Sequence, residues 1–149
     1  MNIKDVLDDR IILNNLHAEN KDDALTQMSI KLMEAGYIED VESFKKDIYL
    51  RESEGITGIG NYVAIPHGKS DSVTHVGISI AKLDQEIEWE TLDGKGVKII
   101  FLFAVSNNNE YAMNHMRLLA QIAGKLGIDE NIEALLKASN KEDIKRVFS

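Results

Sequence analysis

The residue with the clearest chemical potential is His67, which lies between Pro66 and Gly68. Proline fixes the backbone that approaches the histidine, and glycine lets other groups come close to its ring. An imidazole titrates near neutrality, so its free base can attack phosphorus and the phosphorylated ring can pass the group on. From the residues alone, the segment fits either an ordinary loop histidine or a presented nucleophile that could carry a phosphoryl group without a cofactor.

The negative oxygens of a transferring phosphoryl group need positively polarised groups around them. The candidates are Arg51, the backbone N–H groups around Gly68, and His115, one turn into a predicted helix. Arg51 also fits a cation favoured at a helix C-terminus by the helix dipole. His115 also fits a polar position on an amphipathic helix. From the residue pattern alone, both interpretations of each residue stay open.

Hydrophobic spacing predicts two helices before the histidine segment. Asn20 can cap the first helix, and Gly36 ends it. Asp40 opens the second helix, and Arg51 falls on its last turn or just after it. Arg51 is therefore expected to lead into the loop that precedes the histidine.

The middle of the chain predicts strands. Residues 55–60 are glycine-rich and predict a flexible turn, and residues 62–65 predict a short strand that ends at Pro66. Residues 76–81 alternate, as in a strand with one buried face, whereas residues 97–105 are apolar except for Lys98, as in a central strand. His67 is therefore expected just past a strand end.

The last third predicts helices, at 113–127, 132–136 and 144–148. Helices on both sides of several short strands indicate an α/β fold, with a single mixed β-sheet flanked by helices on both faces. With 149 residues, of which 44% are hydrophobic, we expect one domain over residues 1–149.

Composition excludes several classes of function. The net charge of −8 would repel a nucleic acid, and without cysteine there is no thiol nucleophile or thiolate metal site. The longest apolar run, residues 99–105, is too short to span a bilayer, and the first residues carry no export signal. We therefore expect a cytoplasmic protein that does not insert into a membrane.

Two other kinds of site have partial matches in the sequence. Gly58 and Gly60 resemble a phosphate-binding loop only loosely, because the lysine of such a loop is missing. A catalytic metal could be held by His67 and His115 with a carboxylate such as Glu110. No function is assigned to the residues outside these patterns, which are His17, His75 and Trp89.

The sequence resembles the fructose, mannitol and nitrogen-type enzyme IIA domains of the phosphoenolpyruvate-dependent phosphotransferase system. The resemblance covers nearly the whole chain, and its most specific parts are Thr57-Gly58-Ile59-Gly60-Asn61 and Ala64-Ile65-Pro66-His67-Gly68. Arg51 matches upstream, and a second block begins at His115. The resemblance implies that His67 is phosphorylated by the small histidine-containing phosphocarrier protein. It further implies that His115 stabilises the phosphoryl group and that Arg51 neutralises charge.

The fructose-type members are the most similar. The motifs are Ile87-Glu88-Trp89, Leu92-Asp93-Gly94-Lys95, Val97-Lys98-Ile99-Ile100-Phe101 and Pro66-His67-Gly68-Lys69-Ser70. This likeness implies that the acceptor is a cysteine of an enzyme IIB domain, which serves the membrane enzyme IIC. The alternative is a nitrogen-type regulatory domain that signals by phosphorylation-dependent protein binding. Two positions depart from the family: Tyr62, where a small residue is usual, and Ser106, where proline is common.

Overall fold

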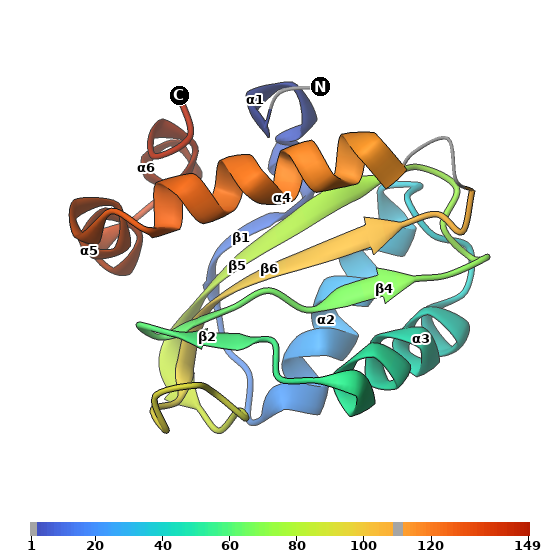
Figure 1. Ribbon diagram of the computed structural model, residues 1–149, viewed down its shortest axis with the longest axis horizontal. Coiled ribbons are helices and arrows are strands. Elements are labelled where there is room, and N and C mark those ends of the chain that lie inside the picture. The colour runs from blue at the N-terminus through green and yellow to red at the C-terminus, as the bar shows by residue number, and fades with distance from the viewer. Residues whose placement is uncertain (1–2, 109–111) are drawn as a thin grey trace.

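A mixed six-stranded sheet lies at the centre of the protein (Figure 1). The computed structural model describes residues 3–108 and 112–149. The strands are β1 (Ile12–Leu16), β2 (Gly58–Gly60), β3 (Val63–Ala64), β4 (His67–Lys69), β5 (Gly77–Ile87) and β6 (Val97–Val105). Their order is β1-β5-β6-β3-β2, and β4 also pairs with β6. Strands β5 and β6 are antiparallel, whereas β3 and β4 run parallel to β6. The predicted α/β fold with one mixed sheet is confirmed.

Helices cover both faces of the sheet (Figure 1). On one face lie α2 (Lys21–Glu34) and α3 (Val41–Glu54). On the other lie α1 (Ile3–Val6), α4 (Ala112–Leu126), α5 (Asp129–Lys137) and α6 (Lys141–Arg146). None of the helices in the described ranges is long and apolar enough to cross a membrane.

Strand β6 separates two hydrophobic cores. Ile100 and Leu102 point into the core under α2 and α3, whereas Phe101 and Phe103 point into the core under α4 and the C-terminal helices. Alternation along a strand that is covered on both sides requires apolar residues at every position. The continuous apolar run therefore predicted a central strand correctly.

The structure corrects the prediction for β5. Residues 76–81 predicted a strand with one buried face, but both faces are buried: Ile78 and Ile80 lie in one core, and Ala81 and Leu83 lie in the other. The strand also continues to Ile87. The small residues of the alternating pattern are themselves buried in tightly packed space. Because they are less hydrophobic than their neighbours, the sequence pattern resembled that of a strand with one exposed face.

Two short strands were not predicted. β1 carries two asparagines, and β2 was predicted as a flexible turn because of its glycines. β1 is held by parallel pairing with β5, and β2 forms a hairpin with β3. The predicted strand 62–65 is shorter than expected, because Tyr62 belongs to the hairpin loop. Long-range pairing, which local patterns do not report, formed these strands.

The predicted helix starts are confirmed by their caps. The side chain of Asn20 accepts a hydrogen bond from the Asp23 N–H, and that of Asp40 accepts one from the Ser43 N–H. Gly36 follows α2 with φ +85°, a conformation that favours glycine. Arg51 lies in the last turn of α3, as expected.

Gly68 allows β4 to approach α3. A Cβ atom placed on Gly68 would lie 2.2 Å from Cε1 of Phe44, whose ring is fully buried. Only glycine leaves room for this contact, which packs the strand that begins with His67 directly against α3. Gly68 therefore serves packing in this fold.

We expect Gly68→Ala to lower the free energy of unfolding by about 1–3 kcal/mol, because the added methyl overlaps the Phe44 ring. Urea denaturation measures this change. The matched control is Gly124→Ala in α4, where nothing lies within 4 Å of an added Cβ. That variant should be stabilised by up to about 1 kcal/mol. Equal unfolding midpoints for Gly68→Ala and the wild type would contradict the packing argument.

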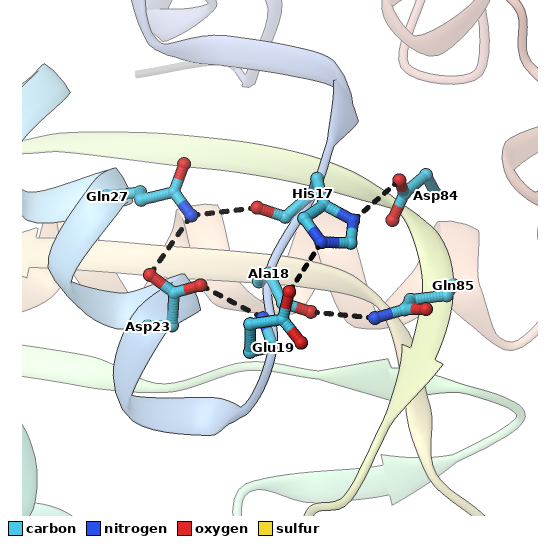
Figure 2. Close-up of polar contacts among 7 residues, drawn as sticks. All are labelled: His17, Ala18, Glu19, Asp23, Gln27, Asp84 and Gln85. Atoms are coloured by element: carbon cyan, nitrogen blue, oxygen red, sulfur yellow. Dashed lines mark hydrogen bonds and ion pairs between the residues drawn. The ribbon is translucent and has the colours of Figure 1, made fainter.

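His17 joins the end of β1 to β5 and to the start of α2 (Figure 2). Its Nδ1 lies 2.8 Å from Asp84 Oδ2, and its Nε2 lies 2.8 Å from Glu19 Oε1. Carboxylate oxygens only accept, so both contacts are hydrogen bonds only when the imidazole is doubly protonated. Gln27 and Gln85 donate to the neighbouring carbonyl oxygens of residues 17 and 18. The bonds to Glu19 and then Asp84 raise the pKa of His17 above its ordinary value.

A raised folded-state pKa gives stability that is present below about pH 6.5 and lost as the pH rises through the folded pKa. We therefore expect the unfolding midpoint of the wild type to fall across that window. In His17→Asn the fall should be smaller. The control is His75→Asn, which also removes an imidazole, but one that packs edge-on against the Tyr37 ring. Identical pH profiles for the wild type and His17→Asn would refute the assignment.

Candidate active site

The backbone places His67 where the strand beside β6 is interrupted. β3 pairs with Ile99 and Ile100, and β4 pairs with residues 103–105. Between them, Pro66 has no N–H to donate, although its carbonyl oxygen accepts from Phe103 N at 3.0 Å. His67 follows the break as the first residue of β4. The expectation that it lies just past a strand end is confirmed, and it also begins a further strand.

The His67 ring is held in one orientation. Its Nδ1 lies 2.7 Å from the Ile65 carbonyl oxygen, which can only accept a hydrogen bond. Nδ1 therefore carries the hydrogen, and Nε2 keeps its lone pair. The ring also stacks on Phe103, with centroids 4.7 Å apart and planes 16° apart. The arrangement presents Nε2 as the nucleophilic atom.

His115 stands edge-on to His67. The two ring centroids are 5.1 Å apart at an interplanar angle of 89°, and His115 also meets Phe103 edge-on at 5.2 Å. The Nδ1 atom of His115 is buried and has no hydrogen-bond partner within the described residues. Most buried polar atoms are paired, so this atom is suited to a group that arrives during function. The structure thus brings together the two histidines that the sequence singled out.

Arg51 lines the same cavity as the two histidines. Its Nη1 donates to the Gly55 carbonyl oxygen at 3.2 Å, which leaves the guanidinium with further N–H groups. The cavity has a volume of about 580 Å³. Its remaining lining residues are Asp47, Leu50, Glu54, Lys69, Val105, Ser106, Asn107, Asn108 and Met116. All three predicted site residues therefore lie around one cavity.

Burial keeps both imidazoles uncharged near neutral pH. Burial first, then the electrostatic effects of His115 and Arg51, lower the pKa of His67 to about 4, against the opposing effect of the Ile65 hydrogen bond. Burial also lowers the pKa of His115, and the Lys69 ammonium adds to that effect. A neutral His67 is the form whose Nε2 can act as a nucleophile.

Lys69 was not singled out in the sequence as a site residue. It follows Gly68 in β4, lines the cavity and acts electrostatically on His115. Its place two residues after His67 was the available signal, because residues i and i+2 of a strand lie on the same face. Arg51 and Lys69 together place two cations on the lining of the cavity.

The alternative metal site has little support from the described side chains. Glu110, the proposed carboxylate, lies outside the described residues. Within the described ranges, no group of three or more histidine, aspartate or glutamate side chains is arranged to hold a metal ion.

The two departures from the family differ in their distance from the site. Tyr62 and Asn61 form the hairpin loop, with φ of +67° and +56°, and the Tyr62 ring lies 4.9 Å from the Lys98 ammonium. Tyr62 does not line the cavity. Ser106 does, and its Oγ accepts from the Asn108 N–H at 3.0 Å. Only Ser106 can therefore contact a group bound in the cavity.

The lowered pKa of His67 predicts its titration. We expect the His67 ring to remain neutral until the pH falls to about 4. Because the unfolded chain binds this proton near pH 6.5, the contribution of His67 to stability should fall as the pH drops from about 6.5 to about 4. NMR of ¹⁵N-histidine-labelled protein measures the midpoint directly. A midpoint above pH 6 would show that the ring is hydrated and would contradict this account.

Comparison with known proteins agrees with the resemblance. The family described as "Phosphoenolpyruvate-dependent sugar phosphotransferase system, EIIA 2" matches residues 5–149. The mannitol-specific enzyme IIA component of Geobacillus stearothermophilus is 34% identical over 139 residues, which cover 90% of each chain. The fructose-specific EIIABC component of Bacillus subtilis is 31% identical over 97% of this chain. This chain spans 22% of the length of that relative. It spans 20% of the length of another, the 2-O-alpha-mannosyl-D-glycerate-specific EIIABC component of Escherichia coli.

Solved structures share the fold. The nitrogen regulatory protein IIA-Ntr of Neisseria meningitidis superposes with a TM-score of 0.88 over 99% of both chains, at 24% identity. The enzyme IIA of an Escherichia coli complex of mannitol-type IIA with phosphorylated IIB gives a TM-score of 0.79 over 95% of this chain and 96% of that one, at 19% identity. The chain therefore belongs to the enzyme IIA family of the phosphoenolpyruvate-dependent sugar phosphotransferase system, a family of phosphotransferases.

Proposed function

We propose that this chain is a single IIA domain, residues 1–149, that carries a phosphoryl group on Nε2 of His67. The observation that carries the proposal is the bond from His67 Nδ1 to the Ile65 carbonyl, beside the unpaired Nδ1 of His115. Together these contacts supply a fixed nucleophile and a second imidazole next to it. No cofactor is needed, because the imidazole itself holds the group.

The donor is the small histidine-containing phosphocarrier protein. The Nε2 lone pair of His67 attacks the phosphorus of the donor phosphohistidine, a new N–P bond forms, and the N–P bond to the donor breaks. The donor imidazole leaves with the electron pair of that bond. His67 keeps its Nδ1 hydrogen throughout, so its bond to Ile65 supports the ring in both states.

His115 and Arg51 stabilise the charge of the transferred group. The Nδ1 of His115 can donate to a phosphoryl oxygen when it carries a proton, and its edge-on position directs the ring toward His67. The Arg51 guanidinium, which lines the same cavity, compensates the negative charge of the group. Two cations and two imidazoles around one cavity support this division of roles.

The acceptor is a cysteine of an enzyme IIB domain. Its thiolate attacks phosphorus, an S–P bond forms, and the bond to His67 Nε2 breaks. The phosphoryl group then serves sugar uptake through a membrane enzyme IIC, which this chain supports from the cytoplasm, where phosphoenolpyruvate is made. We propose a fructose-type sugar, supported by the sequence motifs and by the fructose-specific relative.

We expect incubation with phosphoenolpyruvate, enzyme I and the histidine-containing phosphocarrier protein to add one acid-labile phosphate per chain. Intact mass before and after brief acid treatment measures it. His67→Gln should abolish the label, whereas the matched variant His75→Gln should label as the wild type does. Label retained in His67→Gln would overturn the assignment. A labelled chain that donates to no IIB cysteine would favour the regulatory alternative.

His115→Ala should still be phosphorylated on His67 but transfer the group more slowly or hold it less stably. The expected loss in transfer rate is about 10²-fold, the scale of one electrostatic donor. Quench-flow of the labelled chain with a purified IIB domain measures the rate, and comparison of fructose- and mannitol-type IIB domains tests the sugar class. Unchanged rates in His115→Ala would remove His115 from the mechanism.

A further inference from the structure

A buried ion pair joins the first residue of α2 to the last turn of α3. Lys21 Nζ lies 2.6 Å from Glu52 Oε1, and the side chains are 15% and 8% exposed. Glu90 lies 2.9 Å from the same ammonium, and the Trp89 ring centroid lies 4.7 Å from it. Removing charges from water is costly, so a pair this buried must have its remaining polar atoms satisfied. The second oxygen of Glu52 meets that need.

Glu52 Oε2 accepts a hydrogen bond from the Thr57 hydroxyl at 2.7 Å. Thr57 is 2% exposed, and its oxygen also accepts from Trp89 Nε1 at 3.4 Å. The hydroxyl thus has a donor role toward Glu52 and an acceptor role toward Trp89. These contacts fix the Thr57 side chain, and with it the start of the segment that leads into β2.

The Thr57 backbone leads to the catalytic histidine. Its carbonyl oxygen accepts from Ile65 N at 2.9 Å, and the Ile65 carbonyl oxygen accepts from His67 Nδ1 at 2.7 Å. Ile65 lies in the gap between β3 and β4, and the Pro66 that follows it restricts its backbone to extended conformations. Thr57 supplies the partner for the Ile65 N–H in this gap. The position of the Ile65 carbonyl therefore depends on Thr57.

We propose that Glu52 and Thr57 are positioning residues for His67: they hold the Ile65 carbonyl that keeps the hydrogen on Nδ1 and leaves Nε2 to attack. The inference rests on the proposed function for its catalytic consequence, but the tautomer of His67 can be measured in the unphosphorylated chain. A residue that only stabilised the fold would leave that tautomer unchanged.

The test is Thr57→Val, which keeps the shape of the side chain and removes its hydroxyl. The readout is long-range ¹H–¹⁵N NMR of ¹⁵N-histidine-labelled protein, in which the chain's four histidines give few signals and His67→Gln assigns one of them. We expect the wild type to show the Nδ1–H tautomer and Thr57→Val to show a mixture with the Nε2–H tautomer. Phosphorylation of His67 should slow by at least about tenfold, the scale of a lost orienting partner.

The matched control is Thr91→Val. Thr91 lies near Gly58, and its hydroxyl donates to the Lys95 carbonyl oxygen, outside the chain of bonds to His67. That variant should keep the wild-type tautomer and rate. A second pair, Thr57→Ser and Thr57→Ala, differs only in the hydroxyl. Thr57→Ser should retain the wild-type tautomer and Thr57→Ala should not. This pair keeps the proposal testable if Trp89 fluorescence shows that Thr57→Val does not fold.

A wild-type tautomer and rate in both Thr57→Val and Thr57→Ala would overturn the proposal. A tautomer shift accompanied by slower phosphorylation would support it. Should the wild type accept no phosphate, the proposed function fails, and the tautomers of the same variants still decide whether Thr57 positions His67.

Discussion

The site is built around a backbone hydrogen bond that Pro66 cannot donate. Pro66 has no N–H, so the strand that runs beside β6 is divided into β3 and β4. The Ile65 carbonyl lies at this division, and the His67 ring, two residues later, donates to it. Regular strand pairing would bond that carbonyl to a backbone N–H. The acceptor that orients the imidazole thus lies at the interruption of the strand.

Burial and charge then act together on that imidazole. Enclosure by Phe103 and His115 favours the neutral ring, and the cations of Arg51 and Lys69 disfavour its protonation and that of its neighbour. The same cations favour the addition of a negative phosphoryl group. In the proposed function, a single arrangement therefore excludes the proton and attracts the phosphoryl group, which a charged histidine in water could not do.

The sequence predicted what depends on local chemistry. The caps at Asn20 and Asp40, the last-turn position of Arg51 and the apolar run of β6 follow from residues close in sequence, and the structure confirms them. β1 and β2 were missed because pairing with distant strands forms them. The pairing of the two histidines was implied only by the family resemblance. The contacts of Glu52 with Lys21 and Thr57 join three segments of the chain, and no local pattern could have indicated them.

The site draws its parts from both sides of the sheet. Arg51 comes from the layer of α2 and α3, His115 comes from the layer of α4, and His67 comes from the edge between them (Figure 1). A folding intermediate with only one layer docked would hold an incomplete site. On the roles proposed for these residues, transfer at the full rate therefore requires that both layers have docked. In a cell, partly folded chains would therefore deliver few phosphoryl groups and add little to the activity of the native protein.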